Sequence, residues 1–259
     1  MKYLYIAYQI CIALPIMLAV TIIAAIVCIA GCMFDNRFWG YWPGMIWGRL
    51  FCYVFLIPVH IEGKENIRKG QSYVIVANHQ SFFDIFALYG HIGIKFKWLM
   101  KQEIGKIPFV GWACRAAGHI CIDRASAKHS YDSLGKAKKQ LTDGMSVIIF
   151  PEGTRTPDGQ MQKFKRGSFQ IAADLELPIL PVTINGCYDV MSRRDWHVNR
   201  HSVNISIHKE QTITCNRTDD QSERSRLLRQ AADAAYQSIE SALITDPAGI
   251  VGNGRIEKE

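Results

Sequence analysis

Two short polar motifs carry residue types that could do chemistry, and each directly follows an apolar run. The first occupies residues 78–84 (NHQSFFD), after the apolar run 73–77. Neutral imidazole is a suitable base near pH 7, and a neighbouring carboxylate would hold its tautomer and stabilise the imidazolium. A helix is expected to open here, and its N-terminal dipole could stabilise an oxyanion. The motif therefore predicts a base, His79, that is oriented by Asp84.

A structural interpretation of this motif is equally supported by the spacing. Ser81 and Asp84 also fit a capping box, in which the carboxylate only satisfies backbone donors. His79 could likewise be a packed turn residue. The two roles are compatible for Asp84.

The second motif occupies residues 150–155 (FPEGTR), after the run 147–150. Gly153 allows a tight loop, and Arg155 offers a planar fork suited to phosphate oxygens. Lys163, Lys165 and Arg166 precede an expected helix start, which is a favourable place for an anion. The alternative to an anion-binding loop is a solvated loop without a function. This alternative is preferred only for the turn at residues 157–159.

Other charged residues and histidines give weaker signals. Lys101 and Arg124 each follow an expected strand and could face the same edge as His79, although each alone fits a surface charge. His119 fits a strand residue better than a ligand. The remaining histidines show no pattern of metal ligands, so no metal site is expected; they are His60, His91, His129, His197, His201 and His208.

The elements that must position these residues follow an α/β pattern. Short β-branched runs predict strands at 59–61, 73–77, 96–100, 119–122, 147–150, 179–184 and 203–208. Helices are expected at 83–89, 110–117, 131–142, 168–175 and 222–244. This alternation predicts a mixed, largely parallel sheet of about seven strands flanked by helices. Sites in such sheets lie beyond the carboxyl ends of the strands, where both motifs fall.

The N-terminal part is apolar enough to enter a membrane. Residues 10–34 contain no charge, and a helix of that length exceeds the roughly 30 Å hydrocarbon layer. A retained membrane helix is favoured over a signal peptide or a lipoprotein box at 29–32. Residues 38–59 predict an interfacial or re-entrant helix, with an amphipathic helix on the core as a close alternative. The expected division is 1–58 for membrane anchoring, 59–246 for one catalytic domain and 247–259 for a frayed tail.

The composition of the chain limits the classes of partner that it is expected to bind. The chain has 259 residues, 49% of them hydrophobic, and a net charge of +7. A basic balance attracts nucleic acid or anionic lipid, but no zinc-finger or ribonucleoprotein pattern supports nucleic acid. A phospholipid bilayer is the simpler partner. The eight cysteines include no C-x-x-C pair and are expected to be buried, reduced, structural residues of a protein that faces a reducing cytoplasm.

Taken together, four blocks in order resemble the glycerophospholipid acyltransferase superfamily, specifically the 1-acyl-sn-glycerol-3-phosphate acyltransferases. Residues 78–84 resemble its N-H-x4-D block, and residues 101–124 its second block. Residues 150–155 resemble F-P-E-G-T-R, and residues 180–184 its fourth block. Thr156 stands where the family often has Ser. The resemblance covers roughly residues 73 to 186.

The resemblance implies a single-step acyl transfer at a cytoplasm-facing site on the inner (cytoplasmic) membrane. His79 would take the proton of the lysophosphatidic acid hydroxyl, which attacks the carbonyl of acyl-CoA or acyl-ACP (acyl carrier protein), and Asp84 would orient His79. The product would be phosphatidic acid, and neither a metal nor another cofactor would be needed.

The resemblance also implies a substrate-binding set. Arg155, with Lys101 and Arg124, would hold the glycerol phosphate. Glu152 would shape the pocket or contact the glycerol, and Gly153 and Thr154 belong to the same loop.

Three alternatives stay open at this point. A sister acyltransferase would use glycerol-3-phosphate, a lysophosphatidylcholine-type lipid or a lyso-ornithine lipid as acceptor. A non-catalytic protein that binds or transfers anionic lipid would need the basic surface and the anchor but not His79. A metal-dependent hydrolase would use His79 and Asp84 as ligands.

Overall fold

A computed structural model describes residues 2–122, 138, 140–195, 197–213 and 220–244 of the chain. The strands are β1 (Val59–Glu62), β2 (Val74–Ala77), β3 (Phe96–Lys101), β4 (Ile120–Ile122), β5 (Ser146–Ile149), β6 (Ile179–Asn185) and β7 (Val203–Ile207). The α-helices are α1 (Lys2–Tyr8), α2 (Leu14–Cys32), α3 (Asn36–Trp39), α4 (Trp42–Val54), α5 (Phe83–His91), α6 (Val110–Ala116), α8 (Arg166–Leu175), α9 (Cys187–Val190) and α10 (Gln221–Glu240). A π-helix, η1 (Gln9–Ala13), joins α1 to α2, and η2 (Lys64–Asn66) and η3 (Gln102–Lys106) are 3₁₀ turns.

The seven strands form one sheet in the order β1-β7-β6-β2-β5-β3-β4. Neighbouring strands pair in parallel except for β6 and β7, which are antiparallel. The block from β6 to β4 is therefore parallel, and β7 and β1 run the opposite way at one edge. This confirms the predicted mixed, largely parallel sheet.

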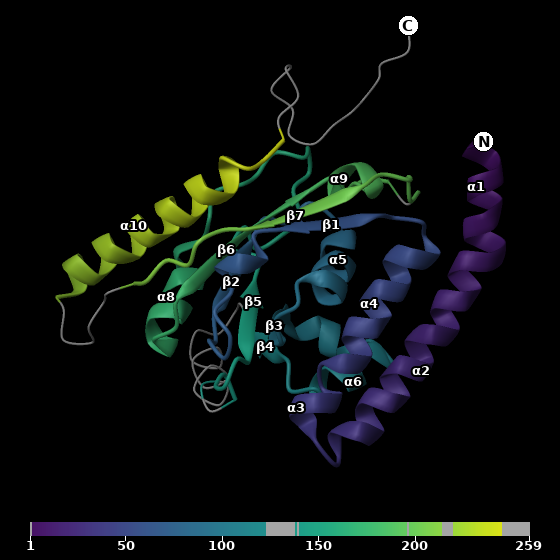
Figure 1. Cartoon of the computed structure of the whole chain (residues 1–259), viewed down its shortest axis with the longest axis horizontal. Helices are drawn as coiled ribbons and strands as arrows, with labels where there is room; N and C mark the ends of the chain where they lie inside the picture. Colours follow the sequence, from purple (N-terminus) through teal and green to yellow (C-terminus); the bar gives the residue numbers. More distant parts are fainter. Residues whose placement is uncertain (1, 123–137, 139, 196, 214–219, 245–259) are drawn as a thin grey trace, which may run out of the picture.

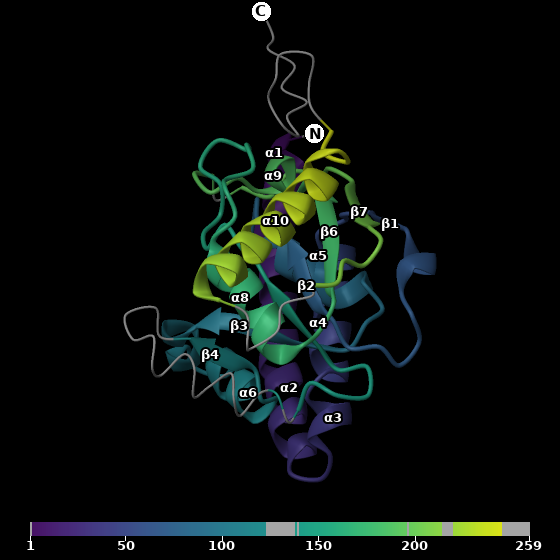
Figure 2. The same ribbon diagram turned by 90° about the vertical axis from the view of Figure 1, so that its left-hand side faces the viewer.

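The sheet is covered on both faces, as Figures 1 and 2 show. Alternate side chains of β2 face opposite ways: Ile75 and Ala77 pack with α4 and α5, while Val74 and Val76 pack with α8 and α10. All of these strand residues are fully buried. Strands buried on both faces need continuous apolar runs, which explains why the β-branched segments in the sequence marked them.

The N-terminal segment Tyr3–Cys32 is a helical stretch of 30 residues, long and apolar enough to cross a membrane by length and composition. Most of it is exposed in the structure, with large apolar side chains turned outward; they include Leu4, Ile10, Leu14, Leu18, Ile23 and Ile26. Its inner side is fastened by polar contacts: Tyr8 Oη donates to the carbonyl of Val54 (2.7 Å) and Trp47 Nε1 donates to Thr21 Oγ1 (2.8 Å).

Helix α4 corresponds to the second apolar segment, and it packs against α5. Phe51 stacks on Phe86 of α5 with ring centroids 3.9 Å apart, and Met45 is buried. Its opposite side is open, since Ile46 and Tyr53 are 52% and 78% exposed. The helix therefore has one face on the core, as the amphipathic alternative supposed, and one apolar face that is uncovered.

The predicted element positions agree with the observed ones to within a few residues. The expected helix at 131–142 falls mostly, and the tail at 247–259 entirely, outside the described residues. The described cysteines are all free thiols; Cys28, Cys52 and Cys187 are buried as expected, whereas Cys11 on the outer side of the N-terminal helical segment is exposed.

The crossing of α4 over α5 gives a stability prediction. A Cβ added at Gly48 would lie 2.8 Å from the carbonyl oxygen of Phe86 and 2.9 Å from the backbone nitrogen of Gly90. Gly48→Ala should therefore push the helices apart and lower the free energy of unfolding by about 1–3 kcal/mol. A lower thermal unfolding midpoint of the solubilised protein would show this.

The matched control is Gly167→Ala in α8, where an added Cβ meets nothing within 4 Å. It should leave the midpoint unchanged or raise it slightly, because alanine costs less backbone entropy than glycine in a helix. Equal destabilisation by both substitutions would contradict the tight crossing.

Candidate active site

One carboxylate oxygen organises the first motif. Asp84 is fully buried, and its Oδ2 accepts hydrogen bonds from His79 Nδ1 (2.8 Å) and from the backbone N–H groups of Gln80 (2.6 Å) and Ser81 (2.8 Å). Because an ionised carboxylate only accepts hydrogen bonds, Nδ1 must carry the proton. The Nε2 lone pair is then left to act as a base. The capping contacts and the orientation of His79 thus come from the same atom.

Ser81 also forms hydrogen bonds at the beginning of α5. Its Oγ accepts from the backbone N–H of Phe83 (3.1 Å) and donates to the carbonyl of Met191 (2.6 Å). The N–H groups of Gln80, Ser81 and Phe83 are therefore all bonded within the protein. These three donors are therefore not free to bind an oxyanion. The sequence predicted that the start of this helix could stabilise an oxyanion, and these three N–H groups do not provide that site.

The imidazole of His79 is held by packing as well as by its carboxylate. Its ring stacks on Phe150 with centroids 3.9 Å apart, and its side chain is 15% exposed. The preceding Asn78 is buried, and its amide bonds both the carbonyl (2.9 Å) and the N–H (2.8 Å) of Ile184 in β6. The turn that carries His79 is therefore fixed to two neighbouring parts of the sheet edge.

Glu152 connects the two motifs. Its Oε1 accepts from the backbone N–H of His79 (2.7 Å), and its Oε2 accepts from the N–H of Gln162 (2.9 Å). Thr156 adds a backbone bond to the carbonyl of His79 (2.9 Å). Burial raises the pKa of Glu152 to about 7, against the opposing effect of its two backbone donors. Both of its oxygens bond backbone groups, so Glu152 supports the loops that surround the base.

Arg155 lies near the His79–Asp84 pair. Its guanidinium stacks 3.9 Å above the ring of Phe82, and the side chain is partly buried. Burial lowers the pKa of Arg155, as does the nearby Arg193, while Asp84 acts in the opposite direction. The cation therefore lies near Asp84.

The loop before Arg155 has the expected glycine turn. Gly153 has a φ of +78°, a conformation that favours glycine, and Thr154 is exposed. A Cβ added at Gly153 would lie 2.7 Å from Nζ of Lys165. The side chain of Lys165 therefore lies against this loop.

The remaining predicted substrate residues are placed less directly. Lys101 ends β3 at the same carboxyl edge, where it forms an exposed ion pair with Glu103 (2.9 Å). Arg124 lies outside the described residues. Their predicted contact with the substrate stays a prediction.

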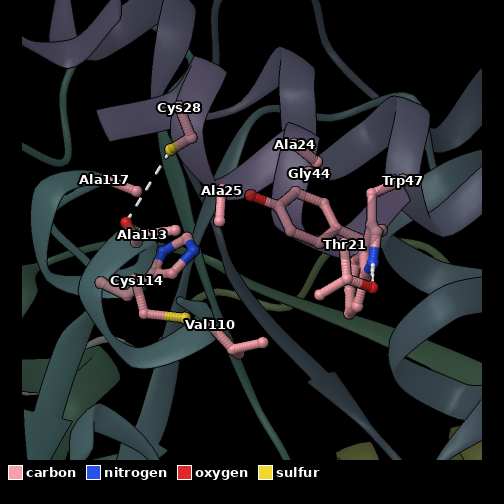
Figure 3. Close-up of a pocket in the computed structure, with 12 residues that line it drawn as sticks. Thr21, Ala24, Ala25, Cys28, Gly44, Trp47, Val110, Ala113, Cys114 and Ala117 are labelled. Carbon is pink, nitrogen blue, oxygen red and sulfur yellow. Dashed lines mark hydrogen bonds between the residues drawn. The ribbon is translucent and has the colours of Figure 1, made fainter. Parts of the chain in front are cut away.

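An apolar cavity of about 70 Å³ lies between α2, α4, α5 and α6 (Figure 3). Small side chains such as Ala25 and Ala113 line it, together with Tyr89. A row of aromatic contacts leads from this wall to the base: Tyr89 to Trp98 (5.9 Å), Trp98 to Phe150 (5.9 Å) and Phe150 to His79. Burial lowers the pKa of another lining residue, His119, to about 3, so that its imidazole is neutral.

Two features of the site were missed by reasoning from the sequence. The double hydrogen bond of Asn78 could have been suspected, because a buried amide directly after a strand must find partners. Arg193 gave no signal, since its loop carries no motif and only the fold brings it next to Arg155.

The buried carboxyl of Glu152 predicts a pH effect on stability. Its pKa is raised from 4.5 to about 7 in the folded protein, so between these values the folded state holds a proton that the unfolded chain releases. The free energy of unfolding should then fall as the pH rises through this window, by at most about 1.4 kcal/mol per pH unit. Glu152→Gln should remove this contribution, which thermal unfolding at several pH values would measure.

The control for this effect is Glu65→Gln, at an exposed carboxylate. It should keep the pH profile of the wild type. A Glu152→Gln protein with that same profile would show that Glu152 is ionised throughout the window.

The sequence and the fold both match known acyltransferases. The family described as Acyltransferase matches residues 58–185. The chloroplastic 1-acyl-sn-glycerol-3-phosphate acyltransferase LPAT1 of Arabidopsis thaliana is 34% identical over 68% of this chain and 50% of its own length. The 1-acyl-sn-glycerol-3-phosphate acyltransferase of Pseudomonas aeruginosa is 39% identical over 50% of each chain. This chain thus spans about half the length of the curated relatives it matches.

A solved structure gives wider coverage. The crystal structure of the 1-acyl-sn-glycerophosphate acyltransferase PlsC from Thermotoga maritima matches with a TM-score of 0.65 and 26% identity, over 89% of this chain and 97% of that one. The matched family segment contains both motifs and their supporting strands. Through this domain, the chain belongs to the acyltransferase family.

Proposed function

We propose that this protein transfers an acyl chain from an acyl thioester to the free sn-2 hydroxyl of 1-acyl-sn-glycerol-3-phosphate, giving phosphatidic acid. The observation that carries the proposal is the His79–Asp84 pair beside Arg155 at the carboxyl edge of the sheet. The pair supplies a base with a fixed tautomer, and the arginine supplies a cation for the acceptor phosphate. The names of the relatives from Arabidopsis thaliana and Pseudomonas aeruginosa support the same acceptor.

The chemistry follows from the state of the imidazole. Nε2 of His79 takes the hydroxyl proton as the acceptor oxygen attacks the thioester carbonyl, forming the new C–O bond. Asp84 stabilises the resulting imidazolium, since its buried charge lies 2.8 Å from Nδ1. The C–S bond then breaks, and the leaving thiolate takes the proton from His79. The enzyme thus returns to its starting state without a covalent intermediate.

The apolar surfaces support a membrane setting for this reaction. The open sides of α2 and α4 present large aliphatic and aromatic side chains, which suits insertion into the cytoplasmic membrane. The cavity between α2 and α6 offers an apolar environment for part of an acyl chain. The active site would face the cytoplasm, where acyl-CoA or acyl-ACP serves as donor.

Removing the base is the first test. His79→Ala should lower the conversion of lysophosphatidic acid to phosphatidic acid by on the order of 10²–10⁴-fold, the usual contribution of a general base. The assay would use membranes with equal amounts of wild type and variant, with acyl-CoA and acyl-ACP supplied separately. His60→Ala, at an exposed residue of β1, is the matched control and should retain full activity.

The outcomes separate the alternatives. A wild type that is inactive with both donors would favour another acceptor or a lipid-binding role. Equal activity of wild type and His79→Ala would refute the mechanism. Loss of activity on exhaustive chelation would favour the metal-dependent alternative.

Arg155 has its own test. Arg155→Gln should raise the KM for lysophosphatidic acid by about 10–100-fold, because a charge-assisted contact to the phosphate is worth about 1.5–3 kcal/mol. Monoacylglycerol, which lacks the phosphate, should be a poor acceptor for the wild type. Its rate of acylation should fall little in the Arg155→Gln variant. Monoacylglycerol turnover equal to that of lysophosphatidic acid in the wild type would contradict the role of Arg155.

A further inference from the structure

The loop that follows α9, residues 191–202, is held by hydrogen bonds at three points. Its first residue, Met191, accepts the hydrogen bond of Ser81 Oγ (2.6 Å). The backbone N–H of Asn199 donates to the carbonyl of Val190 (2.8 Å). Val198 accepts from Nε2 of Gln9 (2.6 Å), a buried polar side chain in η1. The loop is therefore held by the catalytic turn, by α9 and by the N-terminal helix.

A tight turn shapes the part of this loop nearest the site. Ser192 Oγ accepts from the backbone N–H groups of Arg194 (3.3 Å) and Asp195 (3.2 Å) and donates to the Asp195 carboxylate (3.0 Å). This turn directs Arg193 back over the second motif, where its Nη1 donates to the carbonyl of Arg155 (3.3 Å). The guanidinium of Arg193 thus contacts the backbone of Arg155, although the two residues come from different loops.

The positive charge of Arg193 acts on Arg155. Burial is the main cause of the lowered pKa of Arg155, and the charge of Arg193 lowers it further, while Asp84 acts in the opposite direction. Arg193 itself is exposed, so its position is not required for packing. Like charges held together at an open site are stabilised when an anion with two charges binds between them.

We propose that Arg193 is a second phosphate-binding residue, which pairs with Arg155 to select acceptors whose phosphate is a monoester. This inference rests on the proposed function, since it concerns the acceptor of the same site. A phosphate monoester carries close to two negative charges near pH 7 and presents three terminal oxygens. A phosphodiester headgroup carries one charge and two such oxygens, so it gains less from the second guanidinium.

The test uses the full, solubilised chain and compares Arg193→Gln, Arg193→Lys and Arg194→Gln. Arg194 occupies the same turn, is exposed and carries the same charge, so its variant is the matched control. Calorimetry would measure the Kd of a short-chain lysophosphatidic acid, a monoester, and of a short-chain lysophosphatidylglycerol, a diester. Acyl transfer with both lipids would give KM and kcat separately.

Arg193→Gln should raise the Kd and KM for lysophosphatidic acid about tenfold, as expected from the loss of one charge-assisted contact. The substitution should leave kcat unchanged and weaken the binding of lysophosphatidylglycerol much less. The ratio of the two affinities, which measures the preference for the monoester, should therefore become smaller. Arg193→Lys should retain part of the preference, and Arg194→Gln should behave as the wild type.

Several results would overturn this inference. These are wild-type affinity in Arg193→Gln, an equal loss for both lipids, an equal loss in Arg194→Gln, and failure of the wild type to bind lysophosphatidic acid. A wild type that binds lysophosphatidic acid without acylating it would refute the proposed reaction, while the comparison of the two lipids would still test Arg193.

Discussion

The whole active site depends on the burial of one ionised carboxylate. A buried charge is tolerated only where hydrogen bonds replace its lost hydration, and Asp84 Oδ2 gathers three of them within 2.6–2.8 Å. Two come from the backbone of the turn after β2, and the third comes from His79. The three hydrogen bonds to Oδ2 therefore form the turn, begin α5 and orient His79 in a single arrangement.

The second motif depends on that turn through Glu152. Its carboxyl receives the N–H of His79 on one side and the N–H of Gln162 on the other. The loop of residues 150–162 is thereby fixed to the base, and Arg155 is brought beside Asp84. The residues proposed to act as base and to bind the anion are thus connected to each other by hydrogen bonds, although they follow different strands.

Much of this arrangement could be predicted, because the deciding forces are local. Strands such as β2 and β5 are buried on both faces, and their uninterrupted β-branched runs show this directly. Their shared direction then places residues 78 and 150 at one edge of the sheet. The antiparallel pairing of β7 with β6 could not be predicted from the sequence. The direction of a strand depends on how the chain crosses the sheet, and the pattern of side chains does not show this. Arg193 was missed because its contact with Arg155 depends on a loop that two residues distant in the sequence, Ser81 and Gln9, hold in place.

The order of strands in the sheet also bears on how the chain is made. The central strand β2 pairs with β5 and β6, and β1 pairs with β7, which is synthesised last among the strands. The sheet therefore cannot close until most of the chain has left the ribosome, since these pairings are distant in sequence. The apolar helical segment Tyr3–Cys32 precedes every one of these strands in the sequence, so it is synthesised before them. Early capture of this helix by a bilayer would shield it from aggregation, and the catalytic domain would then fold while already tethered to the surface.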